Sequence, residues 1–403
     1  MRAPKILAVV SAIDLDHRYG CTPAWWQLWK GLYEAGVDLI LTPYRGRALE
    51  SPWWRVEPNP CYREGELFAA ARSGVARVKG DTHLRRDEVD PSESFGDRAA
   101  RKAIETWVTP RWRKHLERIL EREADVDAVV VFTVPLNHLR GIPTALRERF
   151  GLPVVYYDAD VPMSLPEYGG MDTGFNIYQG ADPFEYDLFL SNSEGGLERL
   201  RQLGARRAEA LFWGADPGLF APQEVEKEHD VFFYGYGTKF RRDWFERLIS
   251  EPSRRLDASF VLGGADFGVD LGRARLLQYF PVNLLPRVIS ASRVNVNVAR
   301  KPHASVFASS TSRLFELAST GAAIVTNPYE GIERWFEPGR ELLVVNDADE
   351  AVETYRELLA DPAAAAELGR RARERVIEEH TFAQRARRLL GLLGLREPAP
   401  IGG

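Results

Sequence analysis

The chain alternates between short apolar runs and segments whose apolar residues recur with the spacing of a helix. In the first half, the apolar runs predict strands at residues 5–10, 37–43, 127–132, 153–158, 186–192 and 209–213. The helical spacing predicts helices at 21–36 and 195–204. Strands that alternate with helices in this way are typical of parallel α/β layers.

Downstream of the second predicted strand the pattern changes. Residues 66–78 have helical spacing, whereas 79–98 are polar, contain a proline and show little periodicity. The second of these segments is predicted to be either a mobile loop or a lid. Residues 99–123 return to helical spacing and predict a long helix that bends near Pro110.

A segment rich in proline and charge, 216–230, predicts a boundary. Beyond it, a second set of strands is predicted at 231–237, 258–264, 294–298, 322–327 and 341–345. The helical segment 349–380 is interrupted near Pro362, and 381–394 is amphipathic. The second half therefore repeats the architecture of the first.

These elements predict an α/β protein with two facing Rossmann-like, doubly wound domains. The domains are residues 1–220 and 226–380, and a C-terminal helix and tail follow at 381–403, for which a crossing back to the first domain is one option. Two such domains enclose a cleft at the carboxyl ends of their strands, where ligands usually bind. A length of 403 residues agrees with about two or three domains.

The composition is that of a soluble globular protein, with 45% hydrophobic and 28% charged residues. The net charge of −5 argues against a nucleic-acid binder. The two cysteines, Cys21 and Cys61, cannot form a disulfide framework or a structural zinc site. No run approaches the ~18–20 apolar residues of a membrane span, and the first residues lack the apolar core of a signal peptide. We therefore expect a cytoplasmic protein, whose oligomeric state the sequence does not indicate.

The stretch SSTSRLFELASTGAAIVTN, residues 309–327, predicts a helix start, a short helix, a glycine stop and a buried strand. Arg313 falls in the first turn of this helix, where the helix dipole disfavours a cation. Two explanations are open. Either Arg313 pairs with Glu316 one turn later, or an anion binds where free N–H groups, hydroxyls and the guanidinium converge.

Other strand ends of the second half also carry glycines and cations. The first predicted strand leads into GYGTKFRR, which contains Gly235, Gly237, Lys239 and Arg241. The next strand ends in LGGADFG, and the third in NVARKPHAS. Because the carboxyl ends of parallel strands meet at one edge of a sheet, we expect these groups to lie together. Their coincidence favours the anion site over the ion pair.

The second half resembles the C-terminal domain of CgeB-like, spore-maturation type glycosyltransferases, which are related to family 4 enzymes of the GT-B fold. The most specific part of the resemblance is SSTSRLFELASTGAAIVTNPYEGIERWFEPGRELLVVND, residues 309–347. The linker FWGADPGLF and the closing EEHTFAQRA are also similar to elements of that family. The first half matches more loosely, as acceptor domains do.

By that resemblance, Glu316 is expected to bind the ribose hydroxyls of a nucleotide sugar, and Arg313 its diphosphate. Both roles suit the chemistry, because a carboxylate accepts from two vicinal hydroxyls and an arginine binds phosphate through two parallel N–H bonds. The other predicted donor-binding residues are Ser312, Thr311, Gly235, Gly237, Lys239, Arg241, Gly263, His303, Asn327 and Gly331. Many family 4 enzymes carry a second glutamate where this chain has Ala308, so the identity of the sugar does not transfer.

Polar residues at strand ends of the first half are candidates for the acceptor site. Asp158 and Asp160 lie at the end of a predicted strand, and either one is predicted to act as a base or to orient the acceptor. An acid in a turn with no catalytic role is the alternative. His17 is predicted to contact the acceptor or a phosphate. The spacing of the two aspartates also suits a divalent cation, but we expect no metal, because a positively charged pocket stabilises the leaving diphosphate.

The sequence therefore predicts a glycosyltransferase that moves a sugar from a UDP or GDP donor to an unidentified acceptor hydroxyl, without a metal or other cofactor. Retention of the anomeric configuration is the tendency of the family. The alternatives are a nucleotide-sugar epimerase or phosphorylase of the same fold, or a non-catalytic protein of spore-coat or surface assembly. A dinucleotide oxidoreductase is disfavoured, because no predicted first strand leads into a G-x-G-x-x-G turn.

Overall fold

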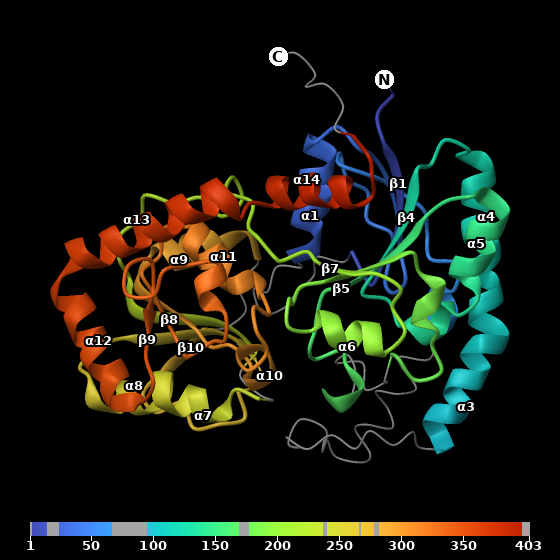
Figure 1. Ribbon diagram of the computed structural model, residues 1–403. Helices are drawn as coiled ribbons and strands as arrows, with labels where there is room; N and C mark the ends of the chain where they lie inside the picture. Colours follow the sequence, from blue (N-terminus) through green and yellow to red (C-terminus); the bar gives the residue numbers. More distant parts are fainter. Residues whose placement is uncertain are drawn as a thin grey trace. The chain divides into compact units, whose positions relative to one another are not determined.

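The computed structural model describes residues 2–13, 24–66, 95–168, 177–236, 240–265, 267–277 and 282–396. The chain divides into two compact units. The first unit comprises Met1–Asp14, Leu28–Phe212 and Ala386–Gly403, and the second comprises Leu15–Gln27 and Trp213–Arg385. Each unit is built on one parallel β-sheet that carries helices on both faces (Figure 1). The predicted α/β class with two Rossmann-like units is confirmed.

The sheet of the first unit has the strand order β3-β2-β1-β4-β5-β6-β7. Its strands are β1 (Lys5–Val10), β2 (Asp38–Pro43), β3 (Arg55–Val56), β4 (Ala128–Phe132), β5 (Val154–Asp158), β6 (Leu188–Ser191) and β7 (Ala208–Ala210). The central strands are buried along almost their whole length, as expected for a sheet covered on both faces. Every strand predicted for this half is present, with small differences at its ends.

Most helices of the first unit bury apolar side chains, but the described side chains of Phe95–Ala103 are exposed or half-buried. The helices are α1 (Ala24–Glu34), α3 (Phe95–Ala103), α4 (Thr109–Arg122), α5 (Ile142–Phe150) and α6 (Leu197–Gln202). Helices α4 and α5 lie on the same face (Figure 1), where Trp112 and Leu146 join the main core. Helix α1 covers the opposite face, where Trp29 packs edge-on against Phe132 of β4.

The bend predicted near Pro110 is a single π-helical turn, η2 (Ile104–Val108), between α3 and α4. The N–H of Thr109 bonds to the carbonyl of Ile104, five residues back. Pro110 has no N–H to continue the α-helical ladder, which explains why the irregular turn lies just before it. The predicted helix at 66–78 lies outside the described residues except for its first residue, and the predicted loop at 79–98 does so except for the start of α3.

The sheet of the second unit has the order β10-β9-β8-β11-β12-β13. Its strands are β8 (His229–Tyr236), β9 (Phe260–Ala265), β10 (Arg275–Leu277), β11 (Ser292–Asn297), β12 (Ile324–Thr326) and β13 (Leu343–Val344). The five strands predicted for this half are present, and β10 is an addition at the edge. One face of the sheet carries an apolar cluster, which includes Phe233, Val296 and Tyr355.

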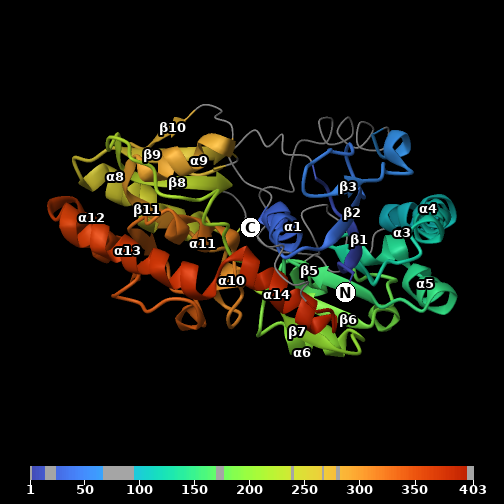
Figure 2. The same cartoon turned by 90° about the horizontal axis from the view of Figure 1, so that it is seen from above.

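The helices of the second unit cover both faces of its sheet. They are α7 (Arg242–Phe245), the π-helix η6 (Glu246–Ser250), α8 (Glu251–Arg255), α9 (Leu285–Ser290), α10 (Lys301–Ala304), α11 (Ser312–Ser319), α12 (Ala348–Ala360) and α13 (Pro362–Glu379). Helix α14 (Phe382–Leu392) only begins in this unit. Helices α12 and α13 follow one another, as Figure 2 shows, and break at the predicted Pro362. The residues of α14 from Ala386 onward group with the first unit.

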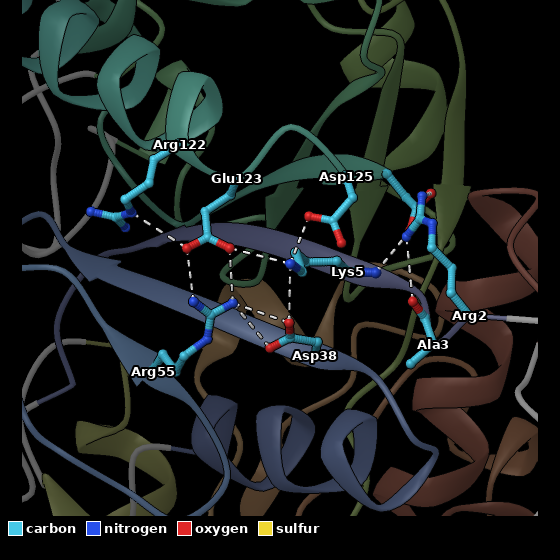
Figure 3. A network of polar contacts seen from close by, with 9 residues as sticks. Arg2, Ala3, Lys5, Asp38, Arg55, Arg122, Glu123 and Asp125 are labelled. Atoms are coloured by element: carbon cyan, nitrogen blue, oxygen red, sulfur yellow. Dashed lines mark hydrogen bonds and ion pairs between the residues drawn. The ribbon is translucent and has the colours of Figure 1, made fainter.

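A network of ion pairs lies at the amino ends of the strands in the first unit (Figure 3). Lys5 Nζ lies 2.6 Å from Asp125, 3.2 Å from Glu123 and 3.4 Å from Asp38. Arg55 lies 2.8 Å from Glu123 and 3.0 Å from Asp38. The network joins β1, β2 and β3 to the end of α4. Ligands of such sheets bind at the opposite, carboxyl ends, so we assign this network to stability.

We expect Glu123→Gln to lower the free energy of unfolding by about 1–2 kcal/mol at pH 7, because Lys5 and Arg55 lose their shared partner. The hydrogen bond from Arg55, with that from Lys5, holds the pKa of Glu123 at about 2, below its ordinary value of 4.5. The carboxylate therefore stabilises the fold above about pH 4.5, and this contribution is lost as the pH falls through about 2.

Urea denaturation between pH 7 and pH 2.5 measures the effect of Glu123→Gln. The difference between the variant and the parent should shrink as the pH falls. Glu198→Gln is a matched control, because Glu198 pairs with Arg201 at an exposed position of the same unit. Equal effects of the two substitutions would contradict the role given to the network.

Candidate functional site

The candidate site lies at the carboxyl edge of the second sheet, where α11 begins. Thr311 is the N-cap of this helix, in extended conformation, and Ser312 is its first residue. The helix ends before Gly321, which has a φ of +70° that suits glycine. The predicted helix start, glycine stop and following strand are all confirmed. Arg313 therefore lies in the first turn of α11, as the sequence indicated.

Arg313 does not pair with Glu316. The two side chains form no ion pair within 4 Å, and the guanidinium carbon lies 4.8 Å from the ring centroid of Phe233 and 5.2 Å from that of Tyr234. Arg313 Nη1 donates to the carbonyl of Val298 over 3.4 Å, and its buried Nε has no hydrogen-bond partner among the described residues. The first explanation of this arginine, an ion pair along the helix, is therefore wrong.

A second guanidinium reaches the same carbonyl. Arg241 Nε donates to Val298 O over 2.8 Å, and Nη1 donates to Tyr236 O over 2.7 Å. Arg241 precedes α7, so two cations from separate elements meet beyond the end of β11. Like charges this close repel each other, and an anion bound between them would relieve that repulsion. The arrangement is suited to a phosphate or diphosphate group.

Glu316 lies one turn after Arg313 and is only 2% exposed. Tyr234 O–H donates to its Oε2 over 2.7 Å, and Gln27 Nε2 donates to its Oε1 over 3.1 Å. Burial raises the pKa of Glu316 to about 7, although the Tyr234 hydrogen bond, the charge of Arg313 and the Gln27 hydrogen bond favour the carboxylate. The predicted ribose acceptor is thus a buried carboxyl group that titrates near neutral pH.

Two glycines at the ends of neighbouring strands allow close backbone approach. Gly235 has a φ of +131°, and a Cβ there would overlap Nη2 of Arg313. Gly264, paired with Gly235 in the sheet, has a φ of +147°, and a Cβ there would overlap the carbonyl of Gly235. Gly263, predicted as a donor-binding residue, is buried within β9 opposite Tyr234. The close approach that the structure shows involves Gly264, and the donor-binding role of Gly263 stays a prediction.

The remaining predicted donor residues form the turns around α11. Asn327 is buried and its Oδ1 accepts from the N–H of Ala299 over 2.8 Å, which joins the ends of β11 and β12. Gly331 has a φ of +78° and lies against the backbone of Ala308. Ala308 itself has a φ of +46°, which an alanine rarely adopts. These residues shape the edge of the site.

His303, in α10, is 1% exposed, and its Nε2 lies 3.5 Å from Nη2 of Arg300. It is therefore buried beside the site. Gly237 and Lys239 fall outside the described residues, so the structure does not place them.

Two segments that carried the family resemblance lie side by side. Ala215 of the FWGADPGLF linker pairs with Thr381 of EEHTFAQRA as an isolated parallel bridge. Arg385 donates to the carbonyl of Trp213 over 3.0 Å, and its Nη2 lies 2.9 Å from His380 Nδ1. Asp216 caps its own turn by accepting from the N–H groups of Gly218 and Leu219. The linker is therefore held against the segment that joins α13 to α14. Asp216 of the linker also contacts Gln27, which donates to Glu316.

The first unit places Asp158 inside its core. The side chain is fully buried, and Ser164 Oγ and Tyr178 O–H each donate to Oδ2 over 2.6 Å. Burial raises the pKa of Asp158 to about 6, against the effect of these hydrogen bonds. Asp158 thus anchors the turn that follows β5, and Asp160 on that turn is partly exposed. The catalytic roles of both stay predictions, and His17 lies outside the described residues.

Sequence reasoning missed two residues that contact Glu316, namely Tyr234 and Gln27. Tyr234 lies in a strand in which Val231–Gly235 are all buried, so no alternation of polar and apolar residues marked it. Gln27 lies 289 positions from Glu316, and no local pattern connects the two.

Among the described residues, no group of three or more His, Cys, Asp or Glu side chains is placed to hold a metal ion. Whether the protein uses a metal stays a prediction. No helix in the described part of the chain is long and apolar enough to cross a membrane.

Residues 241–391 match the glycosyl transferase-like family model. The matched region contains Arg241, Arg313 and Glu316. No curated protein sequence matches the chain. The narrower resemblance to CgeB-like enzymes stays a prediction.

Solved structures cover nearly the whole chain. Sucrose-phosphate synthase from Thermosynechococcus elongatus is 16% identical over 97% of this chain and 98% of that one, with a TM-score of 0.66. A glycosyltransferase from Rickettsia africae is 9% identical over 98% of each chain, with a TM-score of 0.58. Anabaena HepE in complex with UDP-glucose is 12% identical over 97% and 99%, with a TM-score of 0.57. At these identities the likeness shows the fold, and it confirms the predicted GT-B class.

Proposed function

We propose that the protein is a glycosyltransferase that takes a sugar from a UDP-type nucleotide donor and passes it to an acceptor hydroxyl. The observation that carries this proposal is the convergence of Arg241 and Arg313 on the carbonyl of Val298, one helical turn from a buried carboxyl group. A pair of cations beside a hydrogen-bond acceptor suits a ligand that has a diphosphate next to a ribose diol. The family match of residues 241–391 supports the same ligand class.

In this mechanism Arg313 and Arg241 bind the diphosphate and stabilise the charge that develops on it as the bond to the sugar breaks. The N–H groups at the start of α11 add partial positive charge. Glu316 accepts from the ribose hydroxyls and fixes the position of the nucleotide. We assign the acceptor to the first unit, with Asp160 as the candidate that orients its hydroxyl. Retention of configuration and independence from metal are part of the proposal.

The uridine donor is chosen because Anabaena HepE, which shares the fold, is described in complexes with UDP and UDP-glucose. Since ligands that bind the native state raise its melting temperature, a thermal-shift series tests the choice. We expect UDP and UDP-glucose to raise the melting temperature, and 2′-deoxy-UDP to raise it less, because it lacks one of the hydroxyls that Glu316 would bind. If no nucleoside diphosphate shifts the transition, the proposal is wrong.

A product assay then separates transfer from other chemistry. A glycosyltransferase releases UDP from UDP-glucose at a rate that rises with an added acceptor, which a panel of sugars, sugar phosphates and alcohols would supply. Conversion of UDP-glucose to another nucleotide sugar without an acceptor would indicate an epimerase instead. Binding without turnover across the panel would favour a non-catalytic protein.

A further inference from the structure

Three elements that are distant in sequence meet at the carboxyl group of Glu316. Tyr234 comes from β8, Gln27 from α1 and Glu316 from α11. Glu316 and Gln27 are buried at 2% and 0% exposure, and Tyr234 is buried at 2%. A carboxyl group out of contact with water needs donors from the protein, and here each oxygen receives one.

The orientation of the Gln27 amide is fixed by its second contact. Its Oε1 accepts from the N–H of Asp216 over 2.8 Å, and a backbone N–H can only donate. The amide nitrogen must then face Glu316, and it can only donate to it. The two hydrogen bonds therefore run in one direction, from the N–H of Asp216 to Gln27 and from Gln27 to Glu316. Glu316 has to act as the acceptor.

Only the ionised form of Glu316 can accept from Tyr234, Gln27 and two ligand hydroxyls at once. A carboxylate offers about four lone-pair sites, of which Tyr234 and Gln27 occupy two. Among the described residues no other donor reaches these oxygens, which leaves one lone-pair site on each, the number that two neighbouring hydroxyls would use. In the protonated form, one oxygen becomes a donor and the match is lost.

We propose that Tyr234 and Gln27 are positioning residues, which hold the Glu316 carboxylate as the acceptor of the ribose diol and set the pH above which the nucleotide donor binds. The inference rests on the proposed function, since it concerns the same site. Titration of the donor does not explain the effect: each phosphate of UDP-glucose has one ester bond, one anhydride bond and a single strongly acidic group, so its charge is constant near neutral pH.

The groups that face Glu316 act in opposite directions. Burial favours the neutral acid and raises the pKa of Glu316 to about 7, while the Tyr234 hydroxyl, the Arg313 guanidinium and the Gln27 amide favour the carboxylate, in that order. The nearby Asp216 carboxylate is engaged by the N–H groups of its own turn. Loss of the Tyr234 hydroxyl should therefore move the ionisation of Glu316 to higher pH.

The test is the affinity for UDP-glucose, measured by calorimetry from pH 5.5 to 8.5 in the full chain. For the parent we expect binding to tighten as the pH rises through about 7, since the carboxylate is the binding form. For Tyr234→Phe we expect the midpoint to rise by about one pH unit, with binding weakened about tenfold near pH 6.5 and close to the parent at pH 8.5. Glu316→Gln should bind weakly at every pH, without a midpoint.

Tyr355→Phe is the matched control, because Tyr355 is fully buried in the same unit and donates to the carbonyl of Leu248, away from Glu316. It should lose stability in the same way but leave the midpoint unchanged. If Tyr234→Phe weakens binding by the same factor at every pH, Tyr234 is only structural and the inference is overturned. If the parent fails to bind UDP-glucose at any pH, the proposed function itself falls, and the ribose role falls with it.

Discussion

Arg313→Ala is expected to weaken the binding of UDP-glucose by about 100-fold or more. Hydrogen bonds from a guanidinium to phosphate contribute about 1.5–3 kcal/mol each, and a bidentate contact loses two of them. The expected effect on stability is small. Within the described part of the chain the Arg313 side chain makes no ion pair, and its hydrogen bond to Val298 is long, at 3.4 Å. Its contact with the rings of Phe233 and Tyr234 adds about 0.5–1 kcal/mol.

Calorimetric titration of UDP-glucose and urea denaturation, done on the same preparations, measure the two effects of Arg313→Ala. Arg340→Ala is a matched control in the same unit, because Arg340 pairs with Glu337 at an exposed position. Arg313→Lys keeps the positive charge but not the two parallel N–H groups of the guanidinium. Its affinity for UDP-glucose should lie between those of Arg313→Ala and the parent. Unchanged binding in Arg313→Ala would remove the diphosphate from this position and overturn the assignment.

The sequence was sufficient to predict the two parallel sheets, because their strands are apolar runs separated by helical spacing and by proline or glycine. The edge strands β3 and β10 were not predicted, since each begins with an arginine and its residues are exposed or half-buried, so neither shows as a buried apolar run. The series α7, η6 and α8 was also missed. It is broken into short pieces around a π-helical turn, and such pieces lack the extended apolar stripe of a longer helix.

In the candidate site, the local features were predictable and the long-range ones were not. Serine and threonine before an apolar run, with Gly321 after it, were enough to place Arg313 in a first helical turn. The cations at the strand ends followed from the rule that carboxyl ends share an edge. That Glu316 would be enclosed by Tyr234 and Gln27 required the tertiary fold, because these contacts span 82 and 289 positions.

The same limit applies to Asp158. The end of a strand can present its last side chain to solvent or to the core, and the sequence left a catalytic role and a structural role open. The donors that hold Asp158 in the core, Ser164 and Tyr178, follow it by 6 and 20 positions. A polar residue in a loop gives no sign of which buried group it will reach, so the two roles could not be separated without the structure.

Gly235→Ala should weaken donor binding as Arg313→Ala does, although no charged residue is replaced. A Cβ at position 235 would overlap Nη2 of Arg313, and the guanidinium would have to leave its place over Phe233 and Tyr234. We expect UDP-glucose to bind at least about tenfold more weakly. Of the two guanidinium groups that would bind its diphosphate, only that of Arg241 would still be in position. Calorimetric titration measures this loss.

The positive φ of +131° at Gly235 adds a cost of its own, because an alanine is strained there by about 1–2 kcal/mol. Gly339→Ala isolates that cost, since Gly339 has a φ of +83° and open space around its Cβ position. It should lose stability but keep its affinity for UDP-glucose. The decisive comparison is the double variant. If Gly235→Ala acts by displacing Arg313, it should cause no further loss of affinity when Arg313 is already alanine, whereas independent effects would multiply.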